Sequence, residues 1–221
     1  MIRVNQILNQ VNETNTEIIY NSSNSNIKKI SFKFIFLLSV LIIISCIIYF
    51  MHSNYTKSKN QQLSMHMLNK FNITTLYPDS SEYQTINTSN NMFVIGIIEI
   101  PSIDLNYPIL SEITDDNLKI APCKFYGSMP NQTGNLCIAA HNYRNHIFFS
   151  RLNELKLNDI INIYDSKGYK ISYSIYDKYI ADSSHLECTN QDTNSEKEIT
   201  LVTCNKPDNS KRIIVKAKEK K

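Results

Sequence analysis

Three side chains with nucleophilic, proton-transfer and anion-binding chemistry stand at the ends of predicted strands. Cys204 closes the extended run 198–204, and the turn that follows would leave its thiol near a sheet edge. Arg212 opens the next strand, and His141 closes an earlier one. A thiol attacks as its thiolate, a guanidinium favours that anion, and an imidazole exchanges protons near neutral pH. The pattern predicts acyl transfer in which Cys204 attacks a carbonyl, His141 moves protons and Arg212 stabilises the oxyanion.

Each of these residues also has an ordinary structural interpretation. An isolated Cys is more often a small buried apolar side chain than a nucleophile, and an isolated His is more often a hydrogen-bonded surface or core residue. His146 and His185 are rival histidines for the same chemistry. His141 is favoured because it ends a predicted strand, where side chains of neighbouring strands converge.

From residue 93 onward the sequence predicts short strands. Runs of β-branched and aromatic residues alternate with turn residues, a pattern typical of β-sheets. The expected strands are 93–100, 106–110, 136–141, 159–164, 169–180, 198–204 and 212–218, with a helical turn at 115–120 and a short helix at 147–155. So many short strands indicate an all-β sandwich or closed barrel, large enough to fold alone.

An uncharged run of 18 residues, 34–51, precedes this domain. As a helix it would be about 27 Å long, close to the ~30 Å hydrocarbon core of a bilayer. The preceding segment is too long for an ordinary signal peptide, and no A-x-A site follows the run. Cys46 lies in a context similar to a lipoprotein processing site, but apolar residues continue beyond it. We therefore predict an uncleaved transmembrane anchor.

Flanking cations predict the orientation of this anchor. Lysines lie close before the span, whereas Lys57 and Lys59 lie further beyond its other end. Because positive residues favour the cytoplasmic side, we expect a single-pass protein of the cell membrane with its N-terminus inside. The C-terminal domain would then be extracellular.

Residues 52–92 connect the anchor to the strands. Ser, Thr, Asn and Gln occupy 21 of these 41 positions, so a polar stalk is expected, with a short helix near 63–71. The alternative is an ordered helix packed on the domain. The predicted division is thus a cytoplasmic segment 1–33, an anchor 34–51, a stalk 52–92 and a catalytic domain 93–221.

Composition excludes several classes of protein. The four Gly allow neither a G-x-G-x-x-G dinucleotide loop nor a phosphate-binding P-loop. The net charge of +3, from 23 basic and 20 acidic residues, does not favour a nucleic-acid partner.

The remaining exported thiols leave several states open. Five Cys cannot all pair within the chain. Cys123, Cys137 and Cys188 are buried or free thiols, or two of them form a disulfide that spares Cys204. A zinc site from Cys137, His141, Cys188 and Cys204 is conceivable, but no C-x-x-C pair supports it. We expect neither a metal nor a cofactor.

Further phrases accompany the three reactive residues. The Cys ends the phrase Thr200-Leu-Val-Thr-Cys, the His lies in Ile138-Ala-Ala-His-Asn, and Phe149-Ser-Arg-Leu-Asn-Glu-Leu lies between them. In this order, behind an N-terminal anchor, they resemble the sortase family of cell-wall transpeptidases over residues 93–221. The family commonly has Gly before this His, where Ala140 stands here, and Ala would be strained if that backbone needs a positive φ.

This resemblance implies a closed eight-stranded sortase barrel and a cysteine transpeptidase of a Gram-positive cell wall. It would cleave an LPxTG-like sorting motif of surface proteins through a Cys204 thioacyl intermediate. The acyl group would pass to a peptidoglycan precursor or another cell-wall amine. Thr203 and Asn142, beside the reactive residues, are expected to bind substrate. Sortases of the pilin type usually carry an Asp-Pro lid and often a second span, and the sequence shows neither. Class B usually has a long helix before the Cys strand, whereas only the short segment 181–199 stands there. The resemblance therefore favours classes A, D and E.

Two other functions are compatible with these residues. A membrane-anchored cysteine peptidase or hydrolase shares the chemistry up to the thioacyl stage and then uses water. A non-catalytic β-barrel binding module would not need Cys204 at all.

Overall fold

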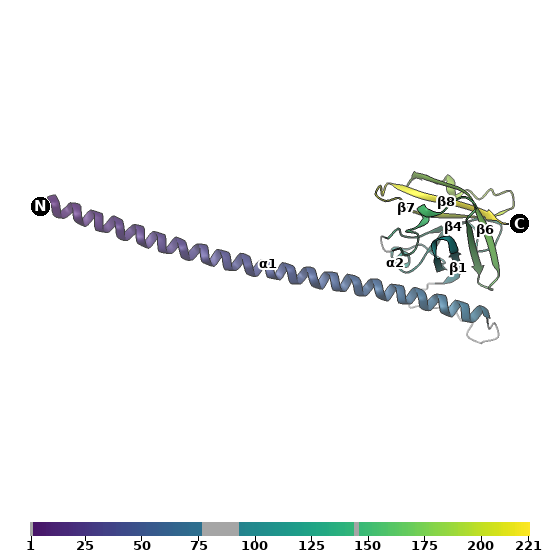
Figure 1. Ribbon diagram of the computed structural model, residues 1–221, viewed down its shortest axis with the longest axis horizontal. Coiled ribbons are helices and arrows are strands. Elements are labelled where there is room, and N and C mark those ends of the chain that lie inside the picture. Colours follow the sequence, from purple (N-terminus) through teal and green to yellow (C-terminus); the bar gives the residue numbers. More distant parts are fainter. Residues whose placement is uncertain (1, 77–92, 144–145) are drawn as a thin grey trace. The chain divides into compact units, whose positions relative to one another are not determined.

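A computed structural model describes residues 2–76, 93–143 and 146–221, and their side chains from residue 32 onward except for 72–76 (Figure 1). The chain forms two units, Met1–Thr56 and Lys57–Lys221, and each is described by itself. The last part of the predicted stalk, 77–92, lies outside the described residues.

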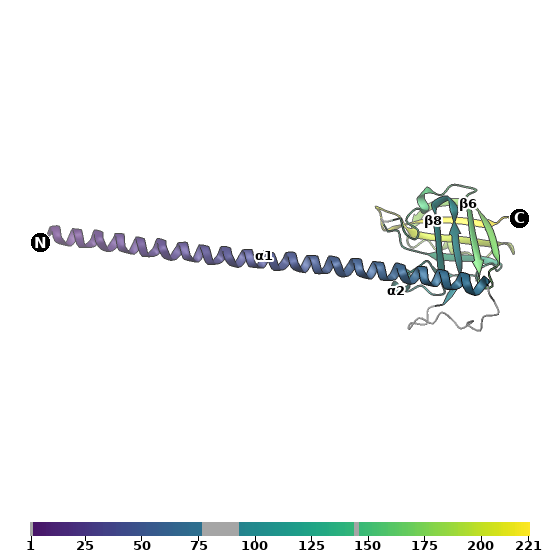
Figure 2. The same ribbon diagram turned by 60° about the horizontal axis from the view of Figure 1, so that its bottom comes forward.

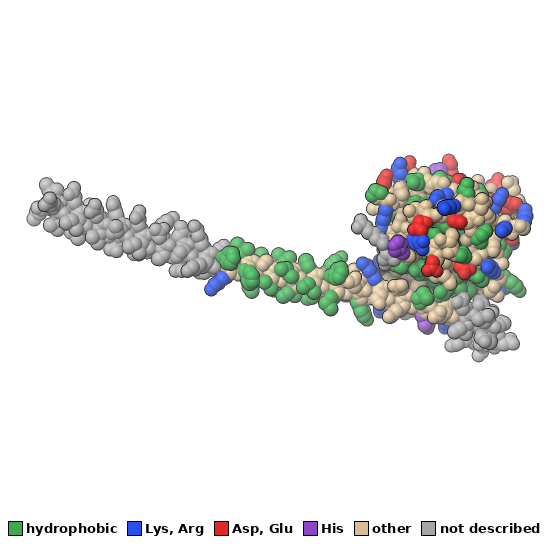
Figure 3. All heavy atoms as spheres, viewed as in Figure 1, with side chains coloured by type: hydrophobic (Ala, Val, Ile, Leu, Met, Phe, Trp, Pro, Cys, Tyr) green, Lys and Arg blue, Asp and Glu red, His purple; other side chains and the backbone are tan. Residues whose placement is uncertain are grey.

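Helix α1, Ile2–Leu76, contains the predicted anchor. Its stretch Phe32–Phe71 includes a segment long and apolar enough to cross a membrane, and none of that segment is buried in protein. Exposed apolar side chains cover the face of this part of the helix that Figure 3 shows. A uniformly apolar, unburied helix of this length is the expected form of a membrane anchor.

In the second unit, the end of helix α1 packs on the β-sheet domain. Met67 is buried against Leu110 and Cys123, and Leu68 and Phe71 are buried against Ile97. The helix runs through the first part of the segment for which a polar stalk is expected, well beyond the short helix near 63–71. This part of the chain is therefore an ordered helix packed on the domain, which was the alternative to a polar stalk. It packs because one side of the helix is apolar at helical spacing.

Eight strands within the described residues close into a barrel (Figure 2). Its order is β1-β2-β3-β4-β7-β8-β6-β5, and the pairs β2–β3 and β4–β7 are parallel. This confirms the predicted all-β closed barrel. The strands are β1 Val94–Ile100, β2 Leu105–Leu110, β3 Cys123–Tyr126, β4 Gly134–Ala139, β5 Ile160–Asp165, β6 Lys170–Asp182, β7 Lys197–Cys204 and β8 Lys211–Glu219.

Short helical turns fill the connections between these strands. They are η1 Pro101–Ile103, α2 Asp115–Leu118, η2 Leu152–Glu154 and η3 Glu187–Thr189. The helix predicted at 147–155 is wrong, because only η2 is helical there. Phe148 has a φ of 52°, which a right-handed helix excludes, and the apolar residues at helical spacing instead plug the barrel core from turns.

Candidate active site

Strand β7 carries Cys204 on the outer face of the barrel. Ile199 and Leu201 point into the barrel core and are fully buried. Because side chains alternate along a strand, Cys204 points to the opposite side, where it is partly exposed. A thiol directed into the barrel would be closed to substrate, so this orientation is a necessary condition for chemistry at Cys204.

Arg212 stands directly opposite Cys204 across the β7–β8 pair. Side chains of directly opposed residues in an antiparallel pair share a face, with their Cβ atoms about 5 Å apart. The Nη1 of Arg212 donates to the carbonyl oxygens of Asn209 and Lys211 at 2.8 and 3.0 Å. The guanidinium is therefore held by backbone carbonyls at the turn between β7 and β8, on the residue that faces Cys204 across the pair.

His141 reaches the same rim from β4. The parallel β4–β7 register ends at the pair Ala139 and Val202, and His141 follows Ala139 by two residues, as Cys204 follows Val202. The Asn142 Nδ2 donates to the Cys204 carbonyl oxygen at 2.8 Å, so the segment around His141 lies next to the end of β7. His141 thus lies just beyond the strand that it was predicted to end. The structure brings the three predicted reactive residues together at one end of the barrel.

Thr203 has a different place from its neighbour. Its side chain is 2% exposed, on the face opposite Cys204, and its Oγ1 donates to the Ala140 carbonyl oxygen at 2.7 Å. The structure does not bring Thr203 into the groove, since its side chain ties β7 to the chain just before His141. Asn142 lies at the rim, where its hydrogen bond positions the Cys204 backbone.

The outer face of β4 and β7 changes from covered to open toward this rim. Asn135 and Cys137 on β4 and Thr200 on β7 are fully buried. Further along, Ala139 and Val202 are partly exposed, as are the reactive residues beyond them. The cover is the β6–β7 loop, residues 183–196, whose carbonyl groups bond the covered side chains. Between the edge of this loop and the thiol, the outer face of the two strands is therefore accessible.

The surroundings of His141 favour its neutral form. Its ring packs on that of Tyr143, with the centroids 4.8 Å apart. Partial burial lowers the pKa of the imidazole, the nearby charges of Lys119 and Lys206 lower it further, and Asp115 raises it. The sequence analysis did not identify Asp115 or Lys119, because no local pattern links residues more than twenty positions before His141 to its ring. It also did not identify Tyr143, although this residue is only two positions away.

Lys119 and Asp115 shift the pKa of His141 in opposite directions, so removing each charge gives a separate test of this environment. We expect Lys119→Met to raise the pKa of His141, so that the imidazolium persists to higher pH, and Asp115→Asn to lower it. NMR titration of the ring protons measures both shifts, with His141→Gln assigning the signal. Lys156→Met, on an exposed loop, is the matched charge-removal control and should leave the titration unchanged. Shifts of the same direction in both variants would contradict this account.

The other described thiols of the barrel are poor nucleophiles. Burial raises the pKa of both Cys123 and Cys137 to about 12, and it also raises that of Cys188. All are free thiols. Within the described ranges, no three His, Cys, Asp or Glu side chains are placed to share a metal ion, so the conceivable zinc site is not formed.

The rival histidines lie elsewhere on the surface. His146 is exposed in the segment after His141 and has a φ of 60°. His185 lies in the β6–β7 loop, where its ring meets that of Tyr179 edge-on at 6.0 Å.

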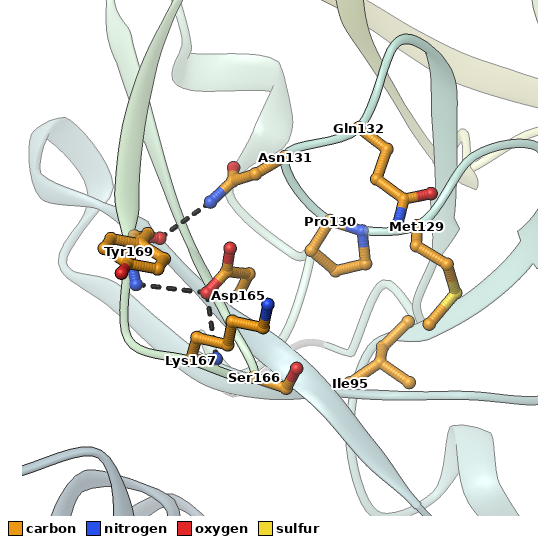
Figure 4. Close-up of a pocket in the computed structure, with 9 residues that line it drawn as sticks. All are labelled: Ile95, Met129, Pro130, Asn131, Gln132, Asp165, Ser166, Lys167 and Tyr169. Carbon is orange, nitrogen blue, oxygen red and sulfur yellow. Dashed lines mark hydrogen bonds between the residues drawn. The ribbon is translucent and has the colours of Figure 1, made fainter.

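A cavity of about 260 Å³ lies at the other end of the barrel (Figure 4). It opens between the β3–β4 loop and the β5–β6 hairpin, with Pro130 and Asn131 on one side and Asp165 and Tyr169 on the other. The β3–β4 loop enters β4 at its first residue, whereas His141 follows the last one. The cavity is therefore separated from the reactive residues by the length of β4, about 20 Å.

Comparisons with known proteins agree with this geometry. Residues 98–220, more than half of the chain, match the family described as "Sortase domain". The chain is 30% identical to sortase A of Bacillus anthracis over 141 residues, which are 62% of this chain and 65% of that protein. The match thus spans slightly less than two thirds of this relative.

Two solved structures have the same barrel. A Clostridium perfringens sortase D5 transpeptidase superposes with a TM-score of 0.61 at 26% identity, covering 73% of this chain and all of that chain. A Clostridium perfringens sortase C, solved with the C-terminal cell wall sorting motif, gives 0.53 at 21% identity and covers 71% and 87% of the two chains.

Proposed function

The chain belongs to the sortase family, and from this premise we propose that it is a membrane-anchored cysteine transpeptidase. The observation that supports the proposal is the strand register, which puts Arg212 opposite Cys204 and the segment of His141 next to them at one end of the barrel, where all three residues are partly exposed. A non-catalytic binding module has no need for a thiol, an imidazole and a guanidinium at one rim.

The first half of the reaction forms a thioacyl enzyme. The Cys204 thiolate attacks the carbonyl carbon of the scissile peptide bond, a C–S bond forms, and the negative charge moves to the carbonyl oxygen. Arg212 donates hydrogen bonds to that oxyanion. When the C–N bond breaks, the His141 imidazolium gives its proton to the leaving amine.

The second half transfers the acyl group. An acceptor amine attacks the thioester carbon, His141 accepts the proton of that amine, and Cys204 leaves as thiolate. A bound amine reacts in preference to water because its effective molarity exceeds what diffusion supplies. A hydrolase would share the first half and differ only here.

For the substrate we propose an LPxTG-like sorting motif, and for the acceptor a cell-wall amine such as that of a peptidoglycan precursor. The sorting motif seen with the Clostridium perfringens sortase C supports the first. The anchor would keep residues 1–33 inside and the barrel outside, next to both reactants. The short β6–β7 loop supports class A, D or E.

The proposal is tested with the full chain in detergent micelles and a library of sorting-motif peptides. Mass spectrometry should find a peptide acyl adduct on Cys204, and an added amine should convert the product from the free acid to the amide. A free acid that persists whatever the amine concentration would identify a hydrolase. The absence of any adduct on Cys204 would refute the enzyme.

A further inference from the structure

The β6–β7 loop is tied to the outer face of the barrel by uncharged side chains. Gln191, in this loop, spans the Asn135 backbone with both ends of its amide. The Asn135 N–H donates to Gln191 Oε1 at 3.1 Å, and Gln191 Nε2 donates to the Asn135 carbonyl oxygen at 3.0 Å. Two bonds of opposite polarity define which end of the amide is which. The Gln191 side chain therefore bonds the backbone of β4 as a neighbouring strand would.

The Asn135 side chain adds further hydrogen bonds between β4 and the β6–β7 loop. Its Nδ2 donates to the carbonyl oxygens of Cys188 and Asn190 at 3.0 and 3.1 Å. Its Oδ1 lies 2.9 Å from the hydroxyl of Thr200, which also lies 3.1 Å from the Cys188 carbonyl oxygen. Asn135 and Thr200 are both fully buried. Lifting the loop would leave these buried polar groups without partners, which is costly.

Gly127 leaves the space that this attachment needs. Its φ of 79° suits glycine, and a Cβ there would lie 1.9 Å from the Asn135 carbonyl oxygen and 2.6 Å from Gln191 Nε2. The β3–β4 loop therefore closes over the Gln191 amide only with glycine at this position. The β3–β4 loop and the start of β4 thus meet the amide of a residue 56 positions further along the chain than Asn135.

We propose that Asn135 and Gln191 are positioning residues that hold the β6–β7 loop as a pre-formed wall of the substrate groove. The inference rests on the proposed function and deepens it. The held loop covers β4 and β7 up to Cys137 and Thr200, and the outer face becomes partly exposed at the next outward-facing pair, Ala139 and Val202. A sorting peptide that reaches Cys204 would lie against this edge, so the attachment acts on peptide binding and not on the reacting atoms.

Gln191→Ala is the first test, with full-chain kinetics on a sorting-motif peptide. A loop that is held only part of the time lowers the apparent affinity by the fraction held. We expect KM to rise about tenfold while kcat stays within about twofold, the signature of lost binding without lost chemistry. Gln132→Ala, in the exposed β3–β4 loop, is the matched control and should change neither constant.

Gln191→Glu adds a readout that a merely structural role would not move. Its carboxylate accepts from the Asn135 N–H but faces the Asn135 carbonyl oxygen without a proton to donate. Lowering the pH protonates the carboxyl group and restores the donor. The KM of this variant relative to wild type should therefore fall as the pH is lowered, whereas that of Gln191→Ala should not change.

Hydrogen exchange separates failure of this inference from failure of the proposed function. Amides of residues 183–196 should exchange faster in Gln191→Ala than in wild type. Wild-type adduct formation together with an unchanged KM in Gln191→Ala, whatever the exchange rate, would overturn the positioning role alone. A wild-type chain that forms no adduct would refute the transpeptidase, and the positioning role would fall with it.

Discussion

Replacing Cys204 by alanine is expected to abolish peptide cleavage and transfer, with a loss of about 10⁴-fold or more in kcat. The thioester cannot form without the sulfur, and the other groups of a nucleophile–base unit contribute little once the nucleophile is removed. The measurement is product formation by the full chain, together with the mass of the intact protein after incubation with peptide. The expected result is an unmodified mass and no amide product.

Cys123→Ala is the matched control for this variant. It removes a fully buried thiol on β3 that packs in one cluster with Met67 of helix α1. Its kcat should remain within about twofold of wild type, since the lost sulfur is buried and bonds only the Ala121 carbonyl oxygen among the hydrogen bonds of the described residues. Turnover that survives Cys204→Ala, or is lost equally in the control, would eliminate Cys204 as the nucleophile.

Arg212→Lys is expected to lower kcat by about 10²–10³-fold, the usual effect of removing one oxyanion donor. Lysine keeps the positive charge, but it loses the planar fork with which arginine bonds the loop carbonyls and an oxyanion at the same time. Single-turnover acylation rates measure this loss without the transfer step. The thiol should still react with a small alkylating reagent.

Arg151→Lys is the matched control for Arg212→Lys. Arg151 binds Glu154 of η2 at 2.7 Å and donates to the Ile103 carbonyl oxygen at 2.9 Å, so its guanidinium is engaged with these two groups. Acylation by this variant should match wild type. A wild-type acylation rate in Arg212→Lys would show that charge alone suffices and would remove the oxyanion role.

The two reactive strand ends owe their alignment to hydrogen bonds between them. Thr203 bonds the Ala140 carbonyl oxygen, and Asn142 bonds that of Cys204. Each bond joins residues about 60 positions apart in sequence. A site built on strand ends held in this way is positioned more accurately than one on free loops.

Most strands were predictable because period-two alternation is a local signal. The predicted strand 198–204 becomes β7, and 212–218 lies within β8. Strand β3 was missed, since its four residues are too few to show alternation and it becomes a strand through pairing with β2 and β4. The segment 147–155 failed for the opposite reason: its apolar spacing suits a helix, but the residues fill the barrel end from turns.

By itself, the sequence determined the apolar segment and the class of fold, and it predicted Cys204, His141 and Arg212 as the candidate reactive residues, because each is marked by local pattern or residue type. Only the tertiary structure decided that Cys204 faces outward, that Asp115 and Lys119 act on His141, and that the Gln191 amide bonds both backbone groups of Asn135. These relations join segments up to 56 residues apart through closure of the barrel. The separation of two residues in sequence does not indicate such contacts, because the register of the strands and the conformations of the loops determine them.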